Sequence, residues 1–294
     1  DTTVSQDTGN PSAGTKEAAE GQTEGETTEP ERIEPDAYFE PIQSNDTANW
    51  PQGPAVWAES AVVMDLDSGT FLYSKNMDVA KYPASITKIL TTLIAIEHSR
   101  PSEKVTFSEN AVYGIEQGSS NIGIRLGENL TMEDCLYGMM LESANEVCVA
   151  VAEHISGSEG DFVKKMNQKA AELGMKNTHF VNCCGLDDDA HLTTARDVAV
   201  MSREILKNHP QIHEYCTIWM ENIVHTTARG DFEFGLSNTN KLIKQYEYAT
   251  GLKTGYTSVA GFCVSASAKK DNIELVAVIM GGADSKSRFQ DAIT

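Results

Sequence analysis

The chain has 294 residues, with 23 Lys and Arg against 43 Asp and Glu, so its formal net charge is −20. Nucleic acid is therefore excluded as an expected partner, because phosphate binding needs a basic surface. Hydrophobic residues make up 40% of the chain, which is enough for a sizeable core, but no apolar run is long enough to cross a bilayer. The six cysteines are too sparse for a disulfide scaffold and lack the paired Cys-x-x-Cys spacing of a structural zinc site.

Residues 1–50 differ in composition from the rest of the chain. They carry 12 acidic and 2 basic side chains among Thr, Glu, Gly, Ser and Pro. Such a segment has little to bury and repels itself, so we predict a disordered acidic linker over 1–50 and a folded domain over 51–294. No basic segment followed by an apolar one precedes it, so the protein is either cytosolic or has lost a signal segment.

The predicted elements fall into three blocks along the folded domain. Residues 61–66 and 71–73 are β-prone and flank the turn sequence Asp67-Ser68-Gly69-Thr70, which predicts a hairpin. Helical spacing then dominates, with N-terminal signals at Thr131 and Thr194, over residues 86–96, 132–154, 161–173 and 195–206. Strand patterns return over residues 250–256, 261–268 and 273–280. This order predicts an α/β (α+β) fold, with an antiparallel sheet from both chain ends, an inserted helical lobe and a site at their junction.

Ser85 and Lys88 stand at the start of the first predicted helix, which is apolar nearly all round. Their spacing puts both side chains on one face, beside the positive end of the helix dipole. An amine on a buried helix is desolvated, which favours its neutral form and lets it act as a base. The pattern alone is weak, because about one Ser-x-x-Lys match is expected by chance in a chain of this length. A capping serine with a snorkelling lysine is the alternative.

Two further polar motifs follow. Ser143-Ala144-Asn145 lies between helical runs and, taken alone, is typical of an interhelix turn, as is Ser119-Ser120-Asn121. Lys253-Thr254-Gly255 lies inside a predicted strand, with Tyr256 after it, and the glycine marks a place where another backbone or a ligand comes close. An edge strand with a protective lysine is the alternative. A second Ser-x-x-Lys match, Ser267 to Lys270, falls in a strand, where residues three apart face opposite sides.

Taken together, the three motifs stand in the order Ser-x-x-Lys, Ser-x-Asn, Lys-Thr-Gly, each on the type of element that serine acyl transfer requires. In this the sequence resembles the penicillin-recognising serine transferases, and within them the low-molecular-weight D-alanyl-D-alanine carboxypeptidases of the S11-like family. The resemblance extends over 83–88, 136–141, 177–182, 238–242 and 251–257, and covers about residue 56 to the C-terminus. It implies the β-lactamase/transpeptidase-like fold, with residues 51–294 as a catalytic domain truncated at its C-terminal end.

The resemblance also implies a role for each site residue. Ser85 is the nucleophile and Lys88 its base, while Ser143 and Asn145 pass the proton to the leaving amine and hold the substrate amide. Lys253 and Thr254 bind the terminal carboxylate, and the backbone N–H groups of Ser85 and Tyr256 form the oxyanion hole. Gly255 belongs to the same strand motif. Residues 281–288 resemble a family segment that brings an arginine to the same carboxylate, which implies that Arg288 binds it too.

The expected reaction is removal of the terminal D-alanine from peptidoglycan stem pentapeptides through an acyl-enzyme, with β-lactams as inhibitors. A serine β-lactamase is one alternative, although residues 180–195 hold Asp187, Asp188 and Asp189 but no glutamate. A non-catalytic penicillin sensor or wall-binding domain is the other. The histidines show no ligand pattern, so we expect no metal and no cofactor. The resemblance implies an extracytoplasmic location, with any membrane anchor in segments absent from this chain.

Overall fold

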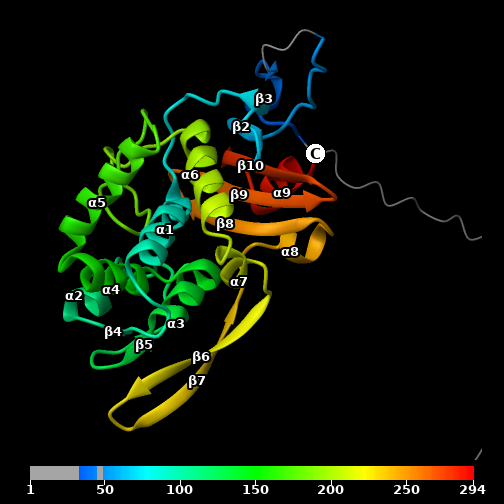
Figure 1. The fold of residues 1–294 in the computed structure, drawn as a ribbon. Coiled ribbons are helices and arrows are strands. Elements are labelled where there is room, and N and C mark those ends of the chain that lie inside the picture. Colours follow the sequence, from blue (N-terminus) through cyan, green and yellow to red (C-terminus); the bar gives the residue numbers. More distant parts are fainter. Residues whose placement is uncertain (1–32, 45–48) are drawn as a thin grey trace, which may run out of the picture. The chain divides into compact units, whose positions relative to one another are not determined.

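Two antiparallel sheets and a group of helices are formed by residues 33–44 and 49–294, the part of the chain that the computed structural model describes (Figure 1). The larger sheet has the strand order β1-β3-β2-β10-β9-β8. Its strands are β1 (Gln43–Ser44), β2 (Ser60–Asp65), β3 (Phe71–Lys75), β8 (Ala249–Thr257), β9 (Gly261–Lys270) and β10 (Ile273–Gly282). β2 pairs with β10, so the early and late parts of the chain build one sheet.

Among the described residues, the helices fall between β3 and β8, apart from one before β1 and one after β10. The first is η1 (Asp36–Phe39) and the last is α9 (Ser285–Ile293). The others are η2 (Ala84–Thr87), α1 (Lys88–His98), α2 (Glu109–Tyr113), α3 (Met132–Tyr137), the π-helical turn η3 (Gly138–Glu142), α4 (Asn145–Ser156), α5 (Glu159–Glu172), α6 (Ala195–Asn208), α7 (Ile212–Cys216) and α8 (Leu242–Gln245). α6 crosses one face of the large sheet and α9 lies against the other (Figure 1). None of the described helices could span a bilayer.

This arrangement confirms the predicted fold class, including the hairpin of β2 and β3 and the three late strands. Two helix starts also form as the sequence indicates. Thr131 and Asp134 make a reciprocal capping box at α3, and the Thr194 side chain accepts from the backbone N–H of Asp197 at α6. Satisfying these free N–H groups fixes where each helix begins.

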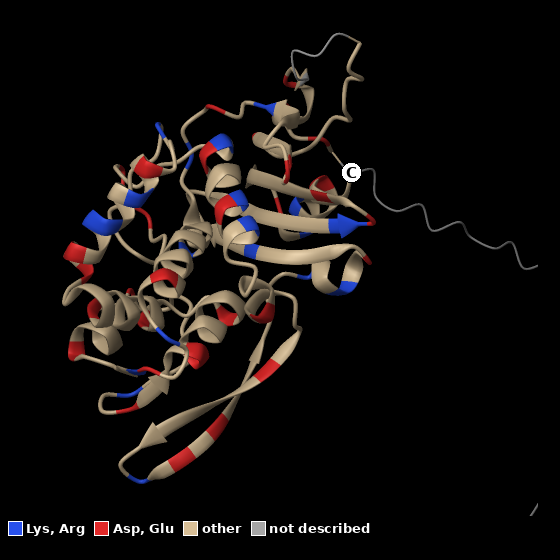
Figure 2. Ribbon diagram, viewed as in Figure 1, with Lys and Arg blue, Asp and Glu red and all other residues tan. Residues whose placement is uncertain are grey.

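The smaller sheet is a feature that our sequence analysis did not predict. Its order is β4-β5-β6-β7, with strands β4 (Lys104–Thr106), β5 (Asn129–Thr131), β6 (Met220–Thr227) and β7 (Gly230–Ser237). β6 and β7 form a long hairpin that carries acidic positions (Figure 2). Both hairpin strands are largely exposed. In β7, Phe232, Phe234 and Leu236 alternate with polar or small residues, so the signal for this strand was present in the sequence.

The folded unit begins at Glu34, earlier than the expected boundary at residue 51. Residues 36–44 form η1 and β1, and β1 pairs with β3. The side chain of Lys75 is completely buried, and its Nζ donates to the carbonyls of Val56 (2.9 Å), Ala58 (2.7 Å) and Ala37. Lys75 thus binds the segments before β2 through their backbone carbonyls. The amino-acid composition of those segments gives no sign of these contacts. Residues 1–32 and 45–48 of the predicted linker lie outside the described residues.

Candidate active site

Ser85 and Lys88 meet where η2 continues into α1. Lys88 Nζ donates to Ser85 Oγ at 3.0 Å. The helix is held in place by its apolar side chains, since Ile89, Leu90 and Leu93 are all completely buried. Lys88 is buried as deeply, whereas Ser85 is only partly buried. The structure therefore presents the serine oxygen at the end of a buried amine, the arrangement expected for an activated nucleophile.

Asn145, the first residue of α4, lies on the other side of the same amine. Its Oδ1 accepts from Lys88 Nζ at 2.7 Å. Ser143 has a left-handed φ of 63°, while Ala144 has an ordinary φ of −60°. Ala144 therefore costs nothing in backbone strain, because the turn places its positive φ one residue earlier, at Ser143. Ser143 Oγ is buried and has no hydrogen-bond partner among the described residues, which leaves it available to a substrate.

β8 brings Lys253 to the same site. Its side chain is completely buried, and Nζ donates to the carbonyl of Thr254 at 3.1 Å. Burial holds the pKa of Lys253 well below its usual value, and the nearby charge of Lys88 lowers it further. An arriving carboxylate would offset both causes and favour the charged form of Lys253.

The rest of the β8 motif lines the approach to the nucleophile. Gly255 packs against η2 so closely that a Cβ built on it would lie 3.0 Å from the backbone nitrogen of Ser85. Thr254 Oγ1 shares a hydrogen bond of 2.7 Å with Thr239 Oγ1. Tyr256 is 54% exposed and stacks on Phe262. The glycine is thus needed for close approach of strand and helix, as the sequence indicates.

Arg288 lies beside the β8 motif, with its guanidinium bound to backbone carbonyls. Its Nη1 donates to the carbonyls of Gly255 (2.9 Å) and Cys263 (3.2 Å), and the side chain is 7% exposed. Burial lowers its pKa to about 10. The guanidinium therefore joins β8 to β9 in this structure and reaches the carboxylate-binding stretch only through the backbone of Gly255.

Sequence reasoning missed the loop that supplies the third partner of Lys88. The carbonyl of Cys184 accepts from Lys88 Nζ at 2.7 Å. Asn182 Oδ1 shapes this loop by accepting from the backbone N–H groups of Cys184, Gly185 and Leu186. The stretch of resemblance over residues 177–182 ends just before Cys183. A backbone carbonyl has no signature in sequence, so its contact with Lys88 appears only in the structure.

His191 fastens this loop to the nucleophile helix. Its Nδ1 accepts from the backbone N–H of Val181 at 3.0 Å, and its Nε2 lies 2.9 Å from Thr87 Oγ1. The ring is therefore neutral with its proton on Nε2, from which it donates to the threonine. Burial lowers the pKa of His191 to about 4; Asp188 opposes this shift and Lys88 adds to it.

We expect this histidine to make the free energy of unfolding depend on pH between 4 and 6.5. The unfolded chain binds a proton on His191 below about pH 6.5, whereas the folded chain does so only near pH 4, so stability rises with pH across this window. The contribution is of the order of 3 kcal/mol, fully present above the window and lost below it. Denaturant unfolding at several pH values should show a smaller rise for His191→Gln than for the wild type. An equal rise in both proteins would contradict this assignment.

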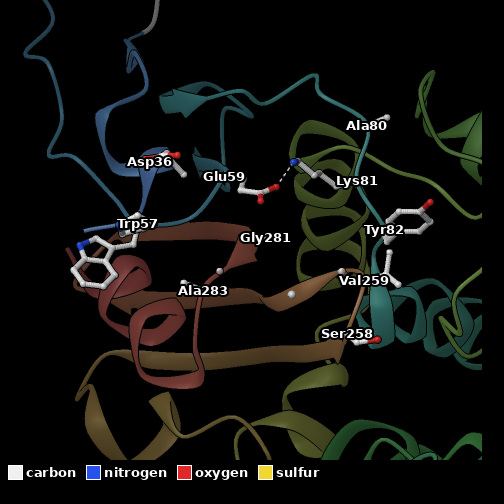
Figure 3. Close-up of a pocket in the computed structure, with 15 residues that line it drawn as sticks. Asp36, Trp57, Glu59, Ala80, Lys81, Tyr82, Ser258, Val259, Gly281 and Ala283 are labelled. Carbon is white, nitrogen blue, oxygen red and sulfur yellow. Dashed lines mark hydrogen bonds and ion pairs between the residues drawn. The ribbon is translucent and has the colours of Figure 1, made fainter. Parts of the chain in front are cut away.

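A cavity of about 530 Å³ adjoins the site (Figure 3). Tyr82, shortly before Ser85, and Ser258, shortly after Tyr256, both line it, together with the ion pair of Lys81 and Glu59. Ser85 itself is not among its lining residues. We therefore distinguish this adjoining cavity from the reaction centre.

Two groups of side chains among the described residues could hold a metal ion, although the sequence pattern predicted no metal site. One is Glu97, Glu204 and His209, and the other is Glu159, Cys183 and Cys184. Within the first, Glu97 already pairs with Lys169 at 2.8 Å. The second lies directly behind the carbonyl that binds Lys88.

Comparison with known proteins gives a consistent result. The profile of the D-alanyl-D-alanine carboxypeptidase family matches residues 47–284. The chain is 43% identical over 236 residues to D-alanyl-D-alanine carboxypeptidase DacF of Bacillus subtilis, covering 79% of this chain and 59% of the relative. It is 34% identical to DacA of Haemophilus influenzae over 241 residues, covering 80% of this chain and 60% of the relative. The chain thus spans about three-fifths of the length of these relatives.

Solved structures share the fold. Penicillin binding protein 5 of Haemophilus influenzae superposes with a TM-score of 0.76 at 31% identity, covering 83% of this chain and 70% of that one. The Streptomyces K15 DD-transpeptidase superposes with a TM-score of 0.79 at 25% identity, covering 83% of this chain and 97% of that one. These matches confirm the transpeptidase-like fold predicted from the three motifs. The chain belongs to the D-alanyl-D-alanine carboxypeptidase family.

Proposed function

We propose that this chain is a serine D-alanyl-D-alanine carboxypeptidase that removes the terminal D-alanine from peptidoglycan stem pentapeptides. The observation that carries the proposal is the position of Lys88 Nζ, 3.0 Å from Ser85 Oγ and 2.7 Å from Asn145 Oδ1. One amine thus connects the nucleophile to the second motif, while Gly255 brings the third motif against the backbone of Ser85.

In the proposed reaction the base is the neutral form of Lys88, whose two N–H groups stay with Asn145 Oδ1 and the Cys184 carbonyl while its lone pair faces Ser85 Oγ. Ser85 Oγ attacks the carbonyl of the last peptide bond and its proton passes to that lone pair. The C–N bond then breaks, and Ser143 relays the proton to the departing D-alanine amine while Asn145 holds the substrate amide. The backbone N–H groups of Ser85 and Tyr256 would bind the oxyanion, each worth about 3 kcal/mol of transition-state stabilisation. Water attacks the ester and releases the shortened peptide.

The substrate carboxylate would bind at β8. Lys253 and Thr254 lie there, and the substrate charge would favour the protonated form of Lys253 that burial opposes. Arg288 adds positive charge through its bond to the carbonyl of Gly255. A β-lactam, whose carboxylate and strained amide imitate the dipeptide, would acylate Ser85. Such a substrate implies work outside the cytoplasmic membrane, with the acidic N-terminal segment as a spacer.

Two measurements test the proposal. The protein is incubated with a pentapeptide ending in D-Ala-D-Ala and free D-alanine is assayed, and in parallel its intact mass is followed after addition of penicillin. We expect D-alanine release together with a long-lived adduct of one penicillin per chain. Rapid penicillin hydrolysis without an adduct would indicate a β-lactamase, and an adduct without D-alanine release would indicate a sensor. Either outcome would overturn the proposal.

The loop acids are already engaged, which favours the carboxypeptidase over the β-lactamase. Asp187 Oδ1 accepts from Thr257 Oγ1 at 2.7 Å, and Asp188 Oδ1 accepts from the backbone N–H of Ala190 at 2.8 Å. Asp189 lies 3.4 Å from the hydroxyl of Tyr82. These carboxylates therefore stabilise the loop, and none of these contacts joins them to Ser85.

A further inference from the structure

Glu159, Cys183 and Cys184 converge behind the catalytic lysine. Glu159 is the first residue of α5, and the two cysteines lie in the loop whose carbonyl binds Lys88. The Cys183 and Cys184 Sγ atoms are 3.7 Å apart, and Cys183 Sγ is 3.2 Å from Glu159 Oε1. The three ligand atoms all lie within 4.8 Å of one another. We refer to these residues as the thiol-carboxylate cluster.

These spacings fit the edges of a tetrahedron around a metal ion. With zinc–sulfur bonds of about 2.3 Å, two thiolates on one ion are about 3.8 Å apart. A thiolate and a carboxylate oxygen on the same ion are about 3.5 Å apart, given a zinc–oxygen bond of about 2.0 Å. The observed separations of 3.7 and 3.2 Å are close to both values. The third separation, from Cys184 Sγ to the Glu159 carboxylate, is within 4.8 Å, so only this edge can require adjustment for an ion to enter the cluster.

The chemistry of the cluster also suits a soft divalent ion. Both cysteines are free and buried. Burial raises the pKa of Cys183 to about 12, and the hydrogen bond with Cys183, together with burial, raises the pKa of Cys184 well above its usual value against the opposing contact with Cys148. A bound ion removes the thiol proton and supplies the positive charge that a buried thiolate lacks. Glu159 is only partly buried, whereas both cysteines are buried.

We propose that the thiol-carboxylate cluster is a binding site for one thiophilic divalent ion of the zinc class. Two S–H bonds break, two metal–sulfur bonds form, and both protons leave to solvent without any redox change. The ion would join the start of α5 to the loop behind the site. That loop also accepts a hydrogen bond from Thr91 Oγ1 at the carbonyl of Cys183, at 2.7 Å, so the ion would tie α5 to α1.

The test is titration of reduced, metal-free full chain with Cd²⁺, which reports thiolate ligation through its sulfur-to-metal charge-transfer absorbance. We expect the absorbance to saturate at one ion per chain, to reverse on addition of excess Zn²⁺, and to be accompanied by a rise in Tm. The double variant Cys183→Ser/Cys184→Ser should lose the absorbance. Cys216→Ser removes a cysteine that is equally buried but lies outside the cluster, in α7, and should retain it.

A second variant keeps the test decisive if the double variant does not fold. Glu159→Gln leaves both thiols in place and should weaken Cd²⁺ binding by at least about tenfold. Binding at Glu97, Glu204 and His209 would give no such absorbance, because that group contains no sulfur. Absence of a saturable absorbance in the wild type, or its persistence in the folded double variant, would overturn the proposal. Neither outcome depends on D-alanine release, so the proposed activity is tested separately.

Discussion

Replacing Lys88 with methionine should slow acylation by penicillin by roughly 10² to 10⁴-fold, the usual contribution of a general base. Methionine retains an unbranched side chain at a completely buried position, so the helix keeps its packing. What it loses is the nitrogen between Ser85 Oγ and Asn145 Oδ1. The rate is measured from the growth of the covalent adduct in intact mass spectra, under conditions where the wild type is fully acylated.

The effect must be separated from loss of folding, because the carbonyl of Cys184 also loses its donor. Lys75→Met is the matched control, since Lys75 is another completely buried lysine, bound to the carbonyls of Val56 and Ala58 rather than to the site. It should be destabilised yet acylate at close to the wild-type rate while folded. Ser85→Ala should form no adduct and sets the baseline. Wild-type acylation by a folded Lys88→Met protein would rule out Lys88 as the base.

The parts of the fold that could be predicted are those where side-chain pattern alone determines structure. β8, β9 and β10 form as expected because marked turns separate them and because β10 carries an unbroken apolar run from Leu275 to Met280. β1 contains only Gln43 and Ser44, and it forms because β3 offers a partner edge. Pairing of this kind depends on tertiary contacts, for which a two-residue strand carries no signal.

The active site shows the same difference between features set by side-chain pattern and features set by tertiary contacts. Ser85, Lys88, Asn145 and Lys253 could be found because the proposed chemistry requires their side chains at recognisable spacings. The carbonyl of Cys184 and the orientation of Arg288 could not, because both depend on how backbone segments approach one another. Gly185 belongs to this second class, and nothing in the sequence around it indicates how closely it lies to the nucleophile.

Gly185→Ala should therefore be far more disruptive than an ordinary glycine substitution. A Cβ at this position would lie 1.8 Å from the carbonyl oxygen of Ala84 and 3.0 Å from the backbone nitrogen of Ser85. Both atoms belong to the backbone, so the loop and the start of η2 must move apart. We expect the free energy of unfolding to fall by about 3 kcal/mol or more, and acylation of the folded fraction to slow by about 10²-fold, because the nucleophile is displaced.

Gly174→Ala separates the steric effect from the backbone strain that both substitutions introduce. Gly174 has a φ of +77° and Gly185 one of +92°, so alanine is strained at either position by about 1 kcal/mol. A Cβ on Gly174 would meet nothing within 4 Å, and the residue follows α5, away from the site. Denaturant unfolding and the penicillin acylation rate should show a small stability loss and unchanged acylation for Gly174→Ala. If both variants lost the same stability and acylated at the same rate, the close approach of Gly185 to Ala84 would not be the reason that this loop needs glycine.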